Sequence, residues 1–145
     1  MRLSPNFTLE ELTVSEVAAR HGLDNTPPQE IIENLKRLAE ALQTLRSFFG
    51  NNAIIVTSGY RSPEVNQKVG GSKNSDHLKG LAADFIVPSF GTPDQVIRAI
   101  LASGVPFKQA IREFDRWTHF SIPAPGEVPR NQALIIDRQG TRLFA

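Results

Sequence analysis

Three side chains of this sequence have the types and the settings that a divalent metal requires. His77 lies in a polar loop bounded by glycines, and Asp84 lies within the apolar segment that follows. His119 lies within a second apolar segment, toward the end of the chain. Two imidazoles and a carboxylate are a sufficient ligand set for a catalytic zinc, which uses three protein ligands and leaves a fourth position for water. The chemistry of such a site is hydrolysis, because bound zinc lowers the pKa of water to about 7 and polarises a carbonyl.

The setting of Asp84 also allows interpretations without a metal. Its neighbours Ala83 and Phe85 are apolar, so the carboxylate is not expected to be fully solvated. A buried carboxylate needs a partner, because burying an unpaired charge is costly. That partner could be a metal, a histidine in a metal-free hydrogen-bonded pair, or a cation such as Arg61 or Arg112.

A hydrolytic site also needs a group that accepts the proton of the attacking water. Glu113 and Asp115 are the candidates, because they are the carboxylates that come shortly before His119. The pattern around Glu113 alone is more typical of a solvated strand residue, and Trp117 more typical of a core residue. His21 lies near the end of a predicted helix and is interpreted as a solvated or capping group.

The composition excludes several other classes of site. The chain has no cysteine, which rules out disulfides, thiolate zinc sites and a cysteine nucleophile. Lys plus Arg total 16 against 15 for Asp plus Glu, so no basic surplus supports binding to nucleic acid. Neither a G-x-S-x-G nucleophile motif nor a phosphate-binding G-x-x-x-x-G-K motif is present.

The distribution of apolar residues gives an expectation about location. No apolar run approaches the roughly 20 residues that a membrane span needs, so we expect no membrane insertion. The beginning of the sequence, MRLSPNFTLEEL, lacks the pattern of a secretory signal. We therefore expect synthesis in a cytoplasm, where the protein stays unless another agent releases it.

The elements that must position these residues follow an α+β pattern, in which helices come early and strands come late. We expect one domain over residues 1–145, without repeats or a linker. Helices are predicted from Thr8 to Arg20 or His21, from a Thr26 cap to residue 49, from Ser62 to residue 70, and over 93–103. Strands are predicted over 53–57, 81–87, 108–114, 117–122 and 132–136, with a turn at 137–140 into a last short strand, and residues 70–80 form a polar loop.

Two longer segments carry a recognisable combination of motifs, SGYRSPEVNQKVGGSKNSDHLKGLAADF and EFDRWTHFSI. The first contains an S-x-H-x-x-G-x-A-x-D element, formed by Ser75, His77, Gly80, Ala82 and Asp84. The second contains a W-x-H element, formed by Trp117 and His119. In this order and separation they resemble the zinc D-Ala-D-Ala carboxypeptidase family of peptidoglycan peptidases, more narrowly its small phage- and prophage-encoded members. NFTLEEL and HGLDNTPP add to the resemblance, which covers nearly the whole chain.

The resemblance implies a fold, an activity and residue roles. The implied fold is a hedgehog/D-Ala-D-Ala-peptidase-like α+β domain, with a central antiparallel sheet and helices packed on one side. The implied activity is Zn²⁺-dependent cleavage of stem peptides in peptidoglycan, at either the D-Ala-D-Ala or the L-Ala-D-Glu bond. The resemblance assigns His77, Asp84 and His119 as zinc ligands, Arg61 as the cation that binds substrate or steadies the oxyanion, and Ser75 as a supporting or substrate-contacting residue, while Trp117 is a candidate substrate contact.

The chain departs from the family pattern at one position. Many members place the catalytic acid three residues before the last histidine ligand, where this chain has Arg116. Glu113 matches the E-F of the phage-type subgroup, and a tight turn after it could bring its carboxylate to the metal. We therefore expect Glu113 as the base, with Asp115 as the second candidate.

A second function stays open beside the peptidase. The chain could be a non-catalytic module of a phage particle in which zinc serves stability or binding. Endopeptidase and carboxypeptidase action, and a lytic or a structural role, are not distinguished by the sequence. A monomer is expected, and a lysin would be accompanied by a holin-type partner that permeabilises the membrane.

Overall fold

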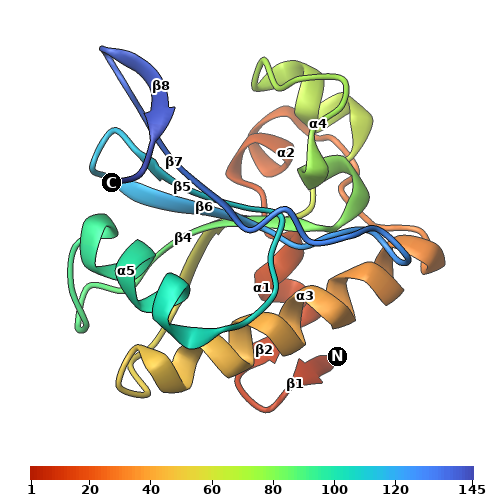
Figure 1. Cartoon of the computed structure of the whole chain (residues 1–145). Coiled ribbons are helices and arrows are strands. Elements are labelled where there is room, and N and C mark those ends of the chain that lie inside the picture. Colours follow the sequence, from red (N-terminus) through yellow and green to blue (C-terminus); the bar gives the residue numbers. More distant parts are fainter.

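A six-stranded sheet forms the centre of the computed structural model, which describes residues 1–145 (Figure 1). The strand order is β3-β4-β6-β5-β7-β8. The strands are β3 (Ile55–Ser58), β4 (Ala82–Ile86), β5 (Gln109–Glu113), β6 (Trp117–Ser121), β7 (Gln132–Asp137) and β8 (Gly140–Leu143). All of them lie within the predicted strand segments or differ by one or two residues, and the predicted α+β class is confirmed.

The long helices cover one face of this sheet. They are α3 (Gln29–Phe48) and α5 (Pro93–Ser103), with the short α1 (Leu9–Thr13) beside them (Figure 1). The apolar stripe of α3 is fully buried, and it joins the inward-facing strand residues in one core. These strand residues include Ala83, Phe85, Ala110 and Phe120. Because strand side chains alternate, the neighbours of these residues point to the opposite face.

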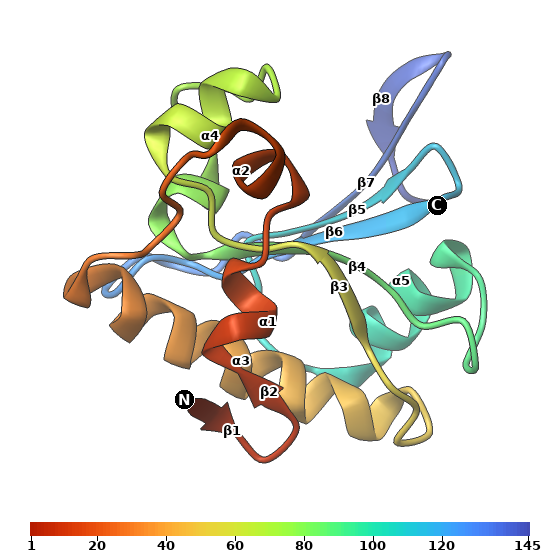
Figure 2. The ribbon, with the colours of Figure 1, turned by 180° about the vertical axis from the view of Figure 1, so that it is seen from behind.

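Three short helical segments lie on the side of that opposite face. They are α2 (Glu16–His21), α4 (Pro63–Lys68) and the 3₁₀ helix η1 (Asp76–Lys79). Figure 2, seen from behind, places α2 and α4 on the side of the sheet away from α3. The loop predicted over residues 70–80 contains η1, which is capped by Ser75 before it and by Gly80 after it, the latter in a left-handed conformation (φ 70°).

The first predicted helix is wrong as a continuous element. The predicted capping box of Thr8 and Glu11 is present, but α1 ends at Thr13 and α2 begins at Glu16. Val14 is extended (ψ 132°), and the Ser15 side chain accepts a hydrogen bond from the Ala18 N–H. A serine that caps the next helix interrupts the first one, because its side chain competes for the backbone donors. The short hairpin of β1 (Arg2–Ser4) and β2 (Phe7–Thr8) was not predicted.

The start of α3 also differs from the prediction. Thr26 is not the cap, and α3 begins only at Gln29, after Pro28. The residue before a proline is disfavoured in the helical region, so Pro27 cannot take the first helical position when Pro28 follows it. Thr26 instead donates its backbone N–H to the Asp24 carboxylate.

One strand pair is parallel, whereas we expected an antiparallel sheet throughout. β5 and β7 run in the same direction, and every other neighbouring pair is antiparallel. Both edges of β6 are occupied, by β4 and β5, so β7 cannot pair with the strand before it and adds at the outer edge of β5. None of the helices is long and apolar enough to span a bilayer.

Candidate metal centre

The three predicted ligands converge on the sheet face opposite the long helices. Asp84 on β4 and His119 on β6 are direct partners across the two strands. Their side chains meet at 2.8 Å, between Oδ1 and Nδ1. His77 reaches the same carboxylate oxygen from η1, with its Nε2 at 3.4 Å. One ligand atom from each residue lies within 4.8 Å of those of the other two.

His77 is fixed by contacts to the loop after β3. Its Nδ1 lies 2.8 Å from the carbonyl oxygen of Gly59, which can only accept a hydrogen bond. When the ring is neutral its proton is therefore on Nδ1, which leaves Nε2, 3.4 Å from Asp84 Oδ1, as the nitrogen that can bind a metal. Metal-binding histidines usually have such a partner on the second nitrogen, which orients the ring. The Arg61 backbone N–H donates to the His77 carbonyl (3.1 Å) and ties the same two segments together.

The donor set fits a small divalent ion. Ligands about 2.1 Å from a tetrahedral zinc lie roughly 3.4 Å from one another. The separation between His77 Nε2 and Asp84 Oδ1 has this value, and that between His119 Nδ1 and the same oxygen is shorter at 2.8 Å. The donor types and their closeness, all within 4.8 Å of one another, fit a zinc ion held by these three side chains.

The charge of Asp84 is stabilised although its side chain is largely buried. Burial alone would raise the pKa of this carboxyl, but hydrogen bonds and positive charge from His119 and His77 lower it well below its usual range. Asp84 is therefore ionised wherever the protein is folded near neutral pH. An ionised carboxylate is the form that binds a cation.

Arg61, which the resemblance assigns as a substrate-binding cation, lies beside Asp84 at the end of β3. Its Nη2 is 3.8 Å from Asp84 Oδ2. Of the two arginines considered as partners of this carboxylate, Arg61 is therefore its neighbour, whereas Arg112 pairs with Asp94. Its other nitrogens donate to the Ser58 hydroxyl (3.3 Å) and to the Asn66 side-chain oxygen (3.1 Å). Burial lowers the pKa of Arg61, while the negative charges of Asp84 and Glu113 oppose that shift. The guanidinium is thus held in place beside the candidate metal site.

Glu113 lies on the same sheet face, next to the three predicted ligands. In the β5–β6 pair, Ile111 is opposite His119 and Glu113 is opposite Trp117, so Glu113 and His119 are diagonal neighbours. Burial and the negative charge of Asp84 raise the pKa of Glu113, although both histidines act in the other direction. A contact with the Trp117 indole also lowers the pKa of Glu113. The indole N–H nevertheless makes no hydrogen bond of normal geometry.

The turn between β5 and β6 is tight, as we expected if the Glu113 carboxylate is to lie near the metal. Phe114 and Asp115 both have φ of 54°, in the left-handed region that is rare for residues other than glycine. The Arg116 N–H closes the turn on the Glu113 carbonyl (3.0 Å). Two consecutive left-handed residues match the right-handed twist of the flanking strands, so β6 can start directly opposite the end of β5.

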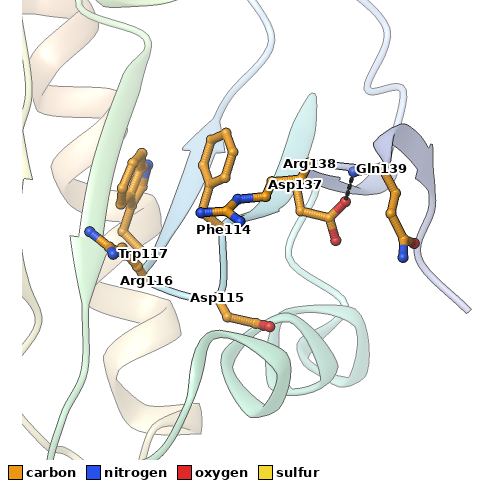
Figure 3. A pocket seen from close by; sticks show the side chains of 7 residues that line it. All are labelled: Phe114, Asp115, Arg116, Trp117, Asp137, Arg138 and Gln139. Carbon is orange, nitrogen blue, oxygen red and sulfur yellow. Dashed lines mark hydrogen bonds between the residues drawn. The ribbon is translucent and has the colours of Figure 1, made fainter.

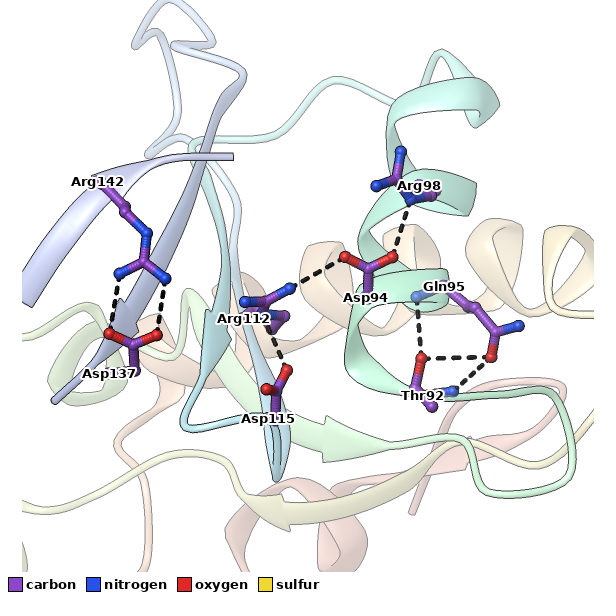
Figure 4. A network of polar contacts seen from close by, with 8 residues as sticks. All are labelled: Thr92, Asp94, Gln95, Arg98, Arg112, Asp115, Asp137 and Arg142. Atoms are coloured by element: carbon purple, nitrogen blue, oxygen red, sulfur yellow. Dashed lines mark hydrogen bonds and ion pairs between the residues drawn. The ribbon is translucent and has the colours of Figure 1, made fainter. Parts of the chain in front are cut away.

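The second candidate for the base, Asp115, is not brought to the metal site. Its carboxylate lies 3.0 Å from Arg112 Nε, and its side chain is 70% exposed. Arg112 also pairs with Asp94 at the start of α5 (3.0 Å), on the helix side of the sheet (Figure 4). Asp115 therefore belongs to a network that anchors the turn, and Glu113 is the carboxylate beside the three predicted ligands.

Of the remaining residues considered in the sequence, two lie near the three predicted ligands and two are exposed to solvent. Trp117 is half-buried next to Glu113, at the end of β6. The Ser75 hydroxyl accepts the His77 backbone N–H (3.2 Å), so it supports the segment that carries this histidine. His21 is exposed at the end of α2, and Arg116 is exposed in the β5–β6 turn.

Sequence reasoning missed two residues that shape the site. The Gly59 carbonyl orients His77, and no side chain could have marked it. Asn66 is buried, accepts from Arg61, and donates to the Ser72 carbonyl (2.9 Å). A polar residue on the buried side of the short α4 was the available signal for Asn66, but its partners depend on how the following loop folds back.

Two comparisons place this geometry among known proteins. A zinc D-Ala-D-Ala carboxypeptidase of Streptomyces albus G is 44% identical over 50 residues, which are 34% of this chain. The chain thereby matches a fifth (20%) of the length of that relative. The sequence model of the family described as Peptidase M15 matches residues 5–121. This match spans most of the chain and includes the three predicted ligands, Arg61 and Glu113, and it shows that the chain belongs to the peptidase M15 family.

Proposed function

We propose that this protein is a zinc metallopeptidase that hydrolyses peptide bonds in the stem peptides of bacterial peptidoglycan. The observation that carries the proposal is the convergence of His77, Asp84 and His119 beside Glu113 on one sheet face. These three side chains would hold the zinc ion. The chemistry supplied by bound zinc is a water of lowered pKa and a polarised carbonyl.

The protein's own residues supply the proton transfers and the charge stabilisation. The Glu113 carboxylate accepts a proton from the attacking water and passes it to the leaving amine. A raised pKa suits this role, because a general base and acid works best when its pKa is near the working pH. The Arg61 guanidinium is held beside Asp84, across the site from Glu113. There it stabilises the negative charge that develops on the scissile carbonyl oxygen.

The substrate class rests on the family and on its named relative. The relative from Streptomyces albus G is named for zinc and for the D-Ala-D-Ala bond, and this chain has three side chains placed to hold a zinc ion. Peptides of the bacterial wall are therefore the first substrates to test. A wall-degrading role for a phage would require release of the protein to the wall, and we propose it on the resemblance to phage-type members.

The proposal is tested with purified protein, added zinc and defined muropeptides. We expect new amino groups and products of defined mass, and the masses distinguish removal of a terminal D-alanine from cleavage within the stem. Glu113→Gln keeps stoichiometric zinc and loses about 10²–10⁴-fold in rate, the usual contribution of a general base.

Asp115→Asn is the matched control for this substitution. It removes a carboxylate two residues away, while asparagine tolerates the left-handed conformation of this position. Activity within about threefold of the wild type is expected, because Asp115 does not face the predicted ligands. Wild-type turnover by Glu113→Gln would contradict the assignment of the base. Bound zinc without any cleavage would favour the non-catalytic module instead.

A further inference from the structure

A cleft lies directly beyond Glu113, where two turns meet at the end of the sheet. One wall is the β5–β6 turn with Phe114 and Trp117, and the other is the β7–β8 turn with Arg138 (Figure 3). Its volume is about 610 Å³. The two aromatic rings are 6.0 Å apart at their centroids, and they form the apolar part of its lining.

The charges along this cleft are not balanced. Asp115 is paired with Arg112, and Asp137 is paired with Arg142 through two contacts of 2.8 Å. Both acidic groups of the lining are therefore compensated by arginines outside it.

The two arginines of the lining are free of such partners. Neither Arg116 nor Arg138 takes part in an ion pair, and both side chains are exposed. Figure 3 shows the Arg138 side chain extending toward Phe114, while the Asp137 and Gln139 side chains point to the other side. The cleft therefore offers an unpaired guanidinium next to aromatic surface.

The strand register gives the span between this cation and the reacting groups. Glu113 on β5 is the partner of Ile136 on β7, so Arg138 is one strand across and two residues further along. The neighbouring strand is about 4.8 Å away and a two-residue step into the turn covers about 5–7 Å, so the Cα atoms of Glu113 and Arg138 are roughly 7–9 Å apart, a span of two to three extended residues. Arg61 lies at the other side of the predicted ligands, next to β3. An extended peptide over Glu113 would thus lie between two guanidinium groups.

We propose that this cleft is a substrate subsite in which Arg138 binds a carboxylate two to three residues from the scissile bond. The inference rests on the peptidase function proposed above and adds a specificity determinant to it. Guanidinium binds carboxylate in two parallel hydrogen bonds, which discriminates strongly against a neutral amide. Phe114 and Trp117 provide the apolar surface along which the intervening residues lie.

The test uses the stem peptide that the wild-type protein cleaves, prepared with each of its carboxylates free or singly converted to an amide. For one carboxylate, two to three residues from the cut bond, amidation lowers kcat/KM by about tenfold or more, as expected for a charged hydrogen bond. In Arg138→Gln the free and amidated peptides are cleaved at equal rates. The loss is mainly in KM, because the contact lies away from the reacting atoms.

Arg130→Gln is the matched control, an exposed arginine before the opposite end of β7. It keeps the wild-type preference for the free carboxylate. If the wild type cleaves every amidated peptide as fast as the free one, or if Arg138→Gln keeps the preference, the subsite is wrong while the peptidase function stands. If the wild type cleaves no wall peptide at all, both proposals fail.

Discussion

At the scale of single residues, the site depends on which groups carry charge. Asp84 is held ionised by two histidines, whereas burial and the charge of Asp84 make Glu113 harder to ionise. Two carboxylates on one sheet face are thereby shifted in opposite directions. Such a separation is typical of sites where one group binds a cation and another moves protons.

The raised pKa of Glu113 makes the metal-free protein less stable at higher pH. The folded state holds this proton more tightly than the unfolded chain does, so stability falls as pH rises from the unfolded pKa, about 4.3, through the folded one. Glu113→Gln removes this penalty. We expect the metal-free variant to melt at a higher temperature than the wild type at neutral and alkaline pH, with the difference vanishing below about pH 4.

The measurement is thermal unfolding in a chelator over a series of pH values. Glu40→Gln is the control, since Glu40 is exposed on α3 and makes no ion pair. If the melting temperatures of Glu113→Gln and the wild type differed by the same amount at every pH, the Glu113 carboxylate would not be the cause of the loss of stability at higher pH.

At the scale of elements, the loop after α4 determines the position of Arg61. Gly71 lies against the Asn66 side chain, where a Cβ atom would be 2.1 Å from Oδ1 and 2.9 Å from Arg61 Nη1. These distances are shorter than any normal contact, so a side chain at this position must displace both groups. The absence of a side chain at residue 71 therefore permits the hydrogen bond between Asn66 and Arg61.

Gly71→Ala is expected to lower kcat/KM by about 10²-fold, the cost of losing one donor to the developing oxyanion. Zinc content stays at the wild-type level, because Gly71 does not contact the three predicted ligands. Ser72→Ala is the control, since Asn66 bonds to the backbone carbonyl of Ser72 and not to its hydroxyl. Wild-type kinetics in Gly71→Ala would remove the positioning role of Asn66.

Most of the helices and strands could be predicted from residue patterns, and the predictions that failed did so for physical reasons. The helix predicted over 93–103 is present as α5, with the Thr92 side chain capping its start and Gly104 in a left-handed conformation at its end. Period-two alternation separates the two faces of β4 and of β6, whereas the pairing of Asp84 with His119 depends on the strand register, which alternation does not give. Contacts made through backbone atoms, such as the Gly59 carbonyl on His77, leave no mark in the sequence.

The parallel placement of β7 could not be predicted for a related reason. Its segment reads as a strand in either direction, and two sheet edges, at β3 and at β5, are open to it once β3 to β6 have paired. The cleft beside Arg138 depends on that placement. This cleft could therefore be found only from the arrangement of the complete sheet, since no sequence motif marks it.

At the scale of the whole molecule, a metal would connect segments that are distant in sequence. The three predicted ligands come from η1, β4 and β6, and zinc bound only to the folded state stabilises that state. At a free zinc concentration of about 1,000 times the dissociation constant, the gain is about 4 kcal/mol. For a chain of this size, that corresponds to a rise in Tm of roughly 8–16 °C.

Differential scanning calorimetry with and without zinc measures this effect. His119→Ala is expected to abolish most of the zinc-dependent rise, while His21→Ala keeps it, since His21 is exposed and remote from the site. A zinc-dependent rise of wild-type size in His119→Ala would place the metal elsewhere.

The match to the family ends at residue 121, at the last residue of β6, whereas Arg138 lies beyond it in the β7–β8 turn. On the two proposals made above, the residues for bond breaking precede this boundary and the residue that selects the peptide follows it. Exchanging the segment after residue 121 would then change the preferred peptide and leave the proposed catalytic residues in place. The hydrogen bonds of β7 to β5 set the condition for such an exchange, because any new tail must still supply a strand that seals this edge.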